Sequence, residues 1–199
     1  MTILHINSSI RGEQSHSSRL AGLLADKLKT AYPASPIIFR DLAQTPPPLL
    51  DPAALQALFT PPEQRSAAQQ DRIAMDDRLI AEVQQADHIV LGVPMYNFGI
   101  PAQLKAWFDA ISRTGVTFRY TANGPEGLLT GKKVHLALAF GGLHRGTPHD
   151  LVTPYLQTAL GFLGMTDLTF IHAEGLAMGE DIAKAALQQA EAEVAALAV

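Results

Sequence analysis

The chain has no cysteine and a small excess of acidic over basic residues, and both features exclude classes of function. Without cysteine it cannot carry a disulfide, an iron–sulfur cluster, a thiol nucleophile or a cysteine-type zinc site. Any redox chemistry therefore requires a bound cofactor. The net charge of -4 opposes binding to polyphosphate, so we expect no nucleic-acid partner.

Long hydrophobic runs are also missing. The first nine residues contain neither a basic stretch nor an apolar segment, so we expect no secretory signal and a cytoplasmic location. The longest uncharged stretch, residues 88–104, is interrupted by Pro94, Asn97 and Pro101, which argue against a spanning helix. We therefore expect no membrane partner.

The residues that are present favour one α/β domain covering residues 1–199, because 47% of them are apolar and can form a large core. Five short runs rich in β-branched residues predict strands, and their starts lie 34 or more residues apart. That spacing is too long for hairpins and leaves room for crossover helices, which favours parallel pairing. The expected strands cover residues 3–6, 37–39, 89–93, 134–138 and 168–171.

Apolar residues recur at helical spacing between the expected strands and again after the last strand. The expected helices are centred on residues 20–28, 73–83, 104–111, 156–163 and 182–197. The first and third strands are apolar at consecutive positions, as strands covered by helices on both faces should be. We predict a three-layer, doubly wound, five-stranded parallel sheet.

Two gaps are longer than one helix needs. Residues 44–62 hold six of the thirteen prolines and predict a proline-rich excursion. In residues 116–129, Val116, Phe118 and Tyr120 alternate with polar residues before Asn123-Gly124, which indicates a hairpin.

Ligands of doubly wound sheets bind beyond the carboxyl ends of the strands, so the loops there are the first candidates for a site. The first, residues 7–18 (the serine loop), carries five serines and leads into a helix start. Free N–H groups at a helix start and the hydroxyls of Ser9, Ser15 and Ser17 could hold a phosphate without a lysine. The alternative is simple helix capping by Ser17 or Ser18.

The motifs of two common nucleotide-binding classes are missing from the serine loop. It contains neither G-x-x-x-x-G-K-[ST] nor G-x-G-x-x-G, which argues against a P-loop nucleotidase and a dinucleotide-binding Rossmann domain. A mononucleotide fits better.

Residues 94–101 (the aromatic loop) place Tyr96, Asn97 and Phe98 together at the end of the third strand. The Asn97 amide and nearby backbone groups could bond the edge of a flat heterocycle, and the aromatic rings could cover its face. The alternative is that these rings complete the core.

Residues 139–146 (the glycine loop) contain Gly141-Gly142, which allow close approach of the backbone to a ligand or merely form a turn. His144 could act as a donor or proton relay, or be an exposed loop residue. His144, His149 and Asp150 lack the spacing of a metal motif, so we expect no metal. The sequence contains no G-x-S-x-G motif, so nothing indicates serine hydrolysis.

The sequence resembles the bacterial family of FMN-dependent NADH-azoreductases and NADH:quinone oxidoreductases, which belongs to the flavodoxin-like superfamily. The resemblance extends from the first strand to the last helix. It is densest in residues 94–98, 103–105, 115–120, 123–128 and 150–155.

The resemblance implies a flavodoxin-like fold and an FMN site built from all three loops. The phosphate would lie against Ser9, Ser15, His16 and Ser17. The isoalloxazine would lie against Pro94, Met95, Tyr96, Asn97, Phe98, Ala139, Phe140, Gly141 and Gly142. Relatives often carry Ser-Arg where this chain has Ala139-Phe140, so a hydroxyl and a cation are replaced.

The resemblance also implies a homodimer with active sites at the interface, where Phe162 of one subunit lies near the flavin of the other. Tyr120, Phe118 and Phe59 are candidates for further walls. NADH or NADPH would reduce the flavin, and a quinone or aromatic azo compound would then take the same place in a ping-pong cycle. Asn97, Tyr120, Phe162 and His144 are the residues we expect to shape this reaction.

Two other functions are compatible with a flavin-binding fold. One is a one-electron carrier that docks to proteins, which the two additional segments and the modest charge disfavour. The other is a flavin-binding regulatory or scaffold protein.

Overall fold

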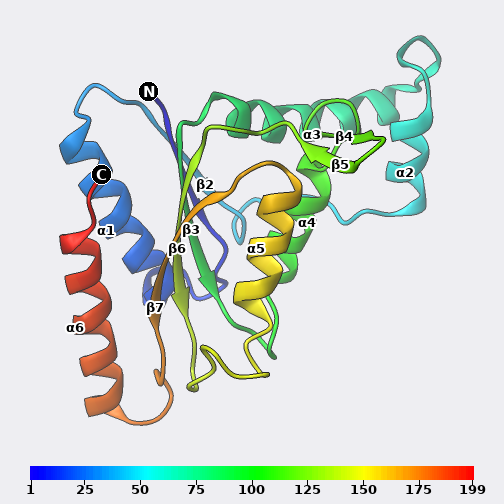
Figure 1. Cartoon of the computed structure of the whole chain (residues 1–199). Coiled ribbons are helices and arrows are strands. Elements are labelled where there is room, and N and C mark those ends of the chain that lie inside the picture. The colour runs from blue at the N-terminus through cyan, green and yellow to red at the C-terminus, as the bar shows by residue number, and fades with distance from the viewer.

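The computed structural model describes residues 1–199 and confirms the expected parallel sheet (Figure 1). Its strand order is β2-β1-β3-β6-β7, and every neighbouring pair is parallel. The five strands are β1 (Ile3–Asn7), β2 (Ile37–Asp41), β3 (His88–Pro94), β6 (Lys133–Ala139) and β7 (Asp167–Ala173).

The strand order places a topological switch point between β1 and β3. From β1 the chain moves to one side to form β2 and then returns across β1 to form β3, β6 and β7. The loops after β1 and β3 therefore leave the sheet in opposite directions and open a crevice between them, where doubly wound folds bind ligands.

Helices cover both faces of the sheet, as the continuous apolar strands predict. Figure 1 shows α1 (His16–Ala31) and α6 (Glu180–Ala196) on one face and α4 (Ala102–Ile111) and α5 (Val152–Phe162) on the other. The remaining long helix, α3 (Ala67–Gln85), packs beside α4. The larger of the two buried clusters lies on the α4 and α5 side and includes the fully buried Trp107.

The proline-rich excursion contains a helix that the proline count did not predict, α2 (Pro52–Phe59). Asp51 caps it by accepting a hydrogen bond from the Ala54 N–H at 2.7 Å, and Pro52 occupies the first turn, where no N–H is needed. The sequence contains this start signal, but the prolines on both sides obscured it.

The expected hairpin is confirmed as β4 (Phe118–Thr121) paired with β5 (Gly124–Gly127). It packs against the C-terminal end of α5, where the contact requires a glycine. A Cβ on Gly127 would lie 2.0 Å from the backbone nitrogen of Gly164.

Within the chain, no helix combines the length and apolarity needed to cross a bilayer.

Candidate functional site

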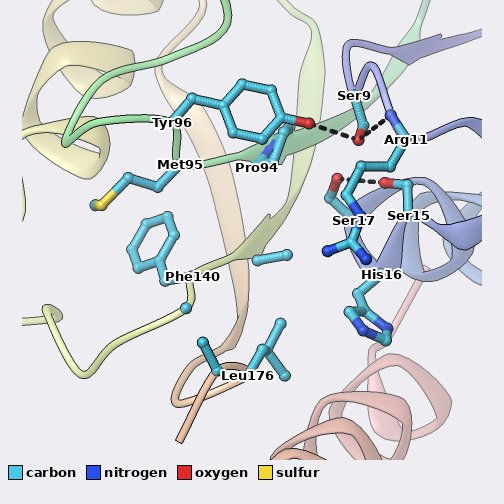
Figure 2. A pocket seen from close by; sticks show the side chains of 13 residues that line it. Ser9, Arg11, Ser15, His16, Ser17, Pro94, Met95, Tyr96, Phe140 and Leu176 are labelled. Atoms are coloured by element: carbon cyan, nitrogen blue, oxygen red, sulfur yellow. Dashed lines mark hydrogen bonds between the residues drawn. The ribbon is translucent and has the colours of Figure 1, made fainter.

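A cavity of about 190 Å³ lies at the carboxyl ends of β1, β3 and β6, at the switch point (Figure 2). The serine, aromatic and glycine loops all contribute walls, as the sequence predicts. The loop after β7 adds Leu176 and Ala177, which sequence reasoning missed because it considered three strand ends only. Of the residues expected to bind a cofactor, the cavity is lined by Ser9, Ser15, His16, Ser17, Pro94, Met95, Tyr96, Ala139, Phe140 and Gly141.

The serine loop does more than cap a helix. The cap of α1 is Ser15, whose hydroxyl accepts from the Ser18 N–H at 3.1 Å, rather than Ser17 or Ser18. The Ser15 and Ser17 hydroxyls lie 3.1 Å apart, and both side chains are buried. Capping therefore accounts for one serine and leaves the burial of the others to be explained.

A second hydroxyl pair connects the serine loop to the aromatic loop. The Ser9 and Tyr96 hydroxyl oxygens lie 2.9 Å apart, and the Arg11 N–H donates to Ser9 at 3.2 Å. Figure 2 shows the Tyr96 hydroxyl pointing across the cavity entrance toward Ser9. Ser8 is turned away and donates to the Gly92 carbonyl, so it takes no part in the site.

Both hydroxyl pairs retain hydrogen-bonding capacity toward the cavity. A pair of hydroxyls has two O–H hydrogens and uses only one of them to bond its members together. The Ser9–Tyr96 and Ser15–Ser17 pairs therefore each keep one O–H donor for an acceptor bound between them. The first-turn N–H groups of α1, at His16 and Ser17, have no partner within the chain and add two more donors.

One free cationic side chain, Arg11, lies among these donors. Arg11 lines the cavity, and sequence reasoning missed it although it is the single arginine of the serine loop. Burial, followed by the charges of Arg11 and Arg19, lowers the pKa of His16 below its usual value. The Arg19 guanidinium is neutralised by Glu191, whereas Arg11 has no carboxylate partner. This end of the cavity is suited to an anion.

The aromatic loop contains a tight turn with a strained backbone. Tyr96 and Gly99 exchange backbone hydrogen bonds of 2.9 and 3.0 Å, and the two residues between them have positive φ, 49° at Asn97 and 67° at Phe98. A bulky residue in this region costs of order 1–3 kcal/mol and typically occurs where function requires it. The turn leaves the Asn97 and Phe98 N–H groups without a partner in the chain.

The glycine loop presents similar free donors. Its carbonyls at Phe140, Gly141 and Gly142 accept from the loop after β7, but the Gly141 and Gly142 N–H groups have no partner within the chain. Phe140 is fully buried and packs edge-on against His172, with ring centroids 6.0 Å apart. Free N–H groups therefore occur in two loops that contribute to the cavity.

His144 is held beside the cavity by its backbone. One carboxylate oxygen of Glu174 accepts from the N–H groups of both His144 and Arg145, each at 2.7 Å. The His144 ring then packs edge-on against Phe98 at 5.7 Å. A Cβ on Gly142 would lie 2.8 Å from His144 Nε2, so glycine at that position makes room for the imidazole.

Six of the expected residues do not line the cavity. Asn97, Phe98, Gly142 and His144 border the cavity without lining it. Tyr120, on β4, is 72% exposed, and Phe162 ends α5 against Phe118, with ring centroids 4.5 Å apart. Figure 1 shows this hairpin at the end of the sheet opposite the carboxyl ends of the strands.

Tyr120 and Phe162 are therefore not part of the cavity within one chain. Phe59 is 80% exposed on α2 and is also outside it. No three carboxylate or imidazole groups of the chain lie close enough together to hold a metal ion.

Together the fold and the site define a flavodoxin-like α/β protein with an anion-binding pocket at its switch point. The family described as having a flavodoxin-like fold matches residues 1–198, and the chain belongs to this family.

Named relatives are similar over almost their whole length. The chain is 57% identical to the FMN-dependent NADH:quinone oxidoreductase of Aromatoleum aromaticum and 58% identical to that of Dechloromonas aromatica, with 98% of each chain covered in both cases. Among solved structures, an azoreductase from Bacillus anthracis matches with a TM-score of 0.90 at 27% identity, covering 98% of this chain and 97% of that one.

Proposed function

We propose that this protein is an FMN-dependent NADH:quinone oxidoreductase that also cleaves aromatic azo bonds. The main support is a cavity whose hydroxyl, N–H and guanidinium groups suit an anion, next to two loops with free backbone N–H groups, in a chain 57% identical to an enzyme of that name. The azoreductase likeness of the fold supports the second activity.

The residues present fit an FMN phosphate. The two spare O–H donors, the N–H groups of His16 and Ser17 and the Arg11 guanidinium all face the same end of the cavity. Charge-assisted bonds from such donors are about twice as strong as neutral ones, so a phosphate dianion is held without a lysine.

The other end fits a flat heterocycle. The unbonded N–H groups of Asn97, Phe98, Gly141 and Gly142 match the carbonyl and nitrogen edge of an isoalloxazine, and Met95 and Tyr96 offer apolar contact. Where relatives carry Ser-Arg, Ala139-Phe140 keeps these backbone donors but contributes a buried ring in place of a cation.

Bound FMN would supply the redox chemistry by accepting a hydride from reduced nicotinamide and passing two electrons per turnover to the acceptor, so a quinone needs one turnover and cleavage of an azo bond to two amines needs two. The chain itself binds and orients the flavin and the substrates. The strained Asn97-Phe98 turn fixes the edge donors, and the Glu174 carboxylate fixes His144 beside Phe98. These two rings form one wall of the space in which donor and acceptor alternate.

A homodimer would supply the opposite wall. Tyr120 and Phe162 lie too far from their own cavity to act there, yet Tyr120 is exposed, as are Phe98, Leu143 and Leu151 near the cavity. We infer that a twofold axis brings the hairpin and α5 end of one subunit over the cavity of the other in a cytoplasmic dimer.

The phosphate site makes a prediction about His16. The pKa of its imidazole is lowered in the ligand-free chain, and a phosphate anion beside it favours the charged form. The pKa should therefore rise when FMN binds, so binding takes up protons between the free and bound pKa values. NMR titration of the His16 ring protons with and without FMN measures this shift, and an unchanged or lower pKa would place the phosphate elsewhere.

Steady-state kinetics test the proposed function as a whole. Varying NADH and a soluble quinone should give parallel double-reciprocal lines, because both substrates use one space in turn. Converging lines would contradict the shared space. A one-electron carrier or a scaffold protein would bind FMN without sustained NADH consumption, which would overturn the proposal.

A further inference from the structure

A second cavity, of about 480 Å³, lies between α5 and β7 on the other side of the glycine loop and its continuation. Six of its nine lining residues have polar or charged side chains, and the other three are Gly146, Pro154 and Phe170. The side chains that matter here are Arg145, Asp150, Thr153, Gln157, Phe170 and His172.

The two cavities share a thin partition. Glu174 fixes the consecutive residues His144 and Arg145 through the same carboxylate oxygen. The His144 ring packs against Phe98 at the candidate site, whereas Arg145 lines the second cavity. Phe140 lines the first cavity and packs directly on His172, which lines the second, so a single layer of rings separates them.

Two charged groups of the second cavity are free to form further ion pairs or hydrogen bonds. Arg145 forms no ion pair with any carboxylate of the chain. One oxygen of the Asp150 carboxylate accepts from the Thr153 N–H at 3.0 Å, and the other has no partner. The nearby Glu174 carboxylate is engaged by two backbone N–H groups, which offsets part of its repulsion toward an anion.

This combination matches the parts of a nucleotide. A guanidinium binds phosphate, and a carboxylate oxygen with neighbouring hydroxyl and amide groups binds ribose hydroxyls. The rings of Phe170 and His172 lie 6.0 Å apart at an interplanar angle of 29° and offer an aromatic surface to a base.

We propose that the second cavity binds the ADP-ribose half of the nicotinamide donor while the nicotinamide reaches over the partition into the candidate site. This inference rests on the proposed function. It accounts for the two cavities that flank the loop held by Glu174. Among the proposed substrates, only the nicotinamide donor consists of two linked nucleotides and could occupy both. Quinones and azo compounds would not use the second cavity.

Reduced nicotinamide riboside tests this division, because it keeps the reacting ring and lacks both the phosphates and the adenosine. Arg145→Gln in the FMN-loaded enzyme should raise KM for NADH about tenfold or more, the loss expected for one charge-assisted bond, and leave KM for reduced nicotinamide riboside unchanged. Arg78→Gln, at an exposed arginine of α3, is the matched control and should change neither. Equal losses for both donors, or no loss for NADH, would overturn the proposal.

A binding measurement separates this inference from the proposed function. ADP-ribose carries no reducing ring, and calorimetry should show it binding to the wild-type protein and at least tenfold more weakly to Arg145→Gln. Absent binding, or binding that ignores Arg145, would overturn the inference even in an active enzyme. Binding that depends on Arg145 in a protein unable to oxidise NADH would support the inference and overturn the proposed function alone.

Discussion

Replacing Ser9 and Ser17 together with alanine should weaken FMN binding by about a hundredfold or more while the fold stays intact. Each serine belongs to a hydroxyl pair that keeps one O–H donor for the phosphate. A hydrogen bond to a charged group contributes about 1.5–3 kcal/mol, so losing two gives the predicted range. Flavin fluorescence titration measures the affinity directly.

Ser9 and Ser17 are chosen because replacing them should not reduce the stability of α1. Ser15 is left in place because it caps α1, and removing a cap typically costs about 1 kcal/mol of stability. Ser18→Ala is the control, since the Ser18 side chain does not line the cavity. Unchanged FMN affinity in the double variant, with a normal melting temperature, would refute the phosphate site.

Phe162→Ala should change the Michaelis constants for quinones several-fold in a dimer that remains folded and loaded with FMN. Its ring packs on Phe118 and on the larger buried cluster at the end of α5, and it does not line the cavity of its own chain. Any effect on acceptor binding must therefore cross a subunit interface. Quinone kinetics, dimer mass and melting temperature are to be measured on one preparation.

Phe108→Ala is the matched control for a purely structural ring. Phe108 is buried beside Trp107 and Tyr155, and truncating such a residue typically costs about 3–5 kcal/mol of stability. It should lower the melting temperature and leave the Michaelis constants alone. If Phe162→Ala behaves in the same way, the ring is structural, and a fully active monomer would likewise exclude the shared site.

The sheet could be predicted because its signals are local and repeated. Consecutive apolar residues in β1 and β3 indicated helices on both faces, and the long spacing between strands required crossovers. The helix α2 escaped prediction because its start, Asp51-Pro52, lies among prolines that indicate irregular structure when only counted. Strand order had no local signal and was not predicted.

The site was predicted less completely than the fold. The switch-point rule identified three loops, and all three line the cavity. Arg11 was missed because one arginine in a polar loop has many uses, and Leu176 because the loop after β7 carries no distinctive motif. The Ser9–Tyr96 bond joins residues 87 positions apart, a pairing that only the folded chain brings about.

Phe98 shows why backbone strain cannot be read from sequence. Its φ of 67° would ordinarily call for glycine or asparagine, yet the chain places a large ring there, 51% exposed against His144. The backbone hydrogen bonds between Tyr96 and Gly99 hold the chain in this conformation, and these contacts form only in the folded protein.

Anaerobic mixing of the purified protein with NADH, followed by a quinone, is the most direct test of the proposed enzyme. We expect a yellow protein with one FMN per chain, whose visible absorbance is bleached by one equivalent of NADH without quinone present. One equivalent of quinone should then restore the absorbance. A protein that binds no FMN, or whose bound FMN is not reduced by NADH, would not be an FMN-dependent NADH:quinone oxidoreductase.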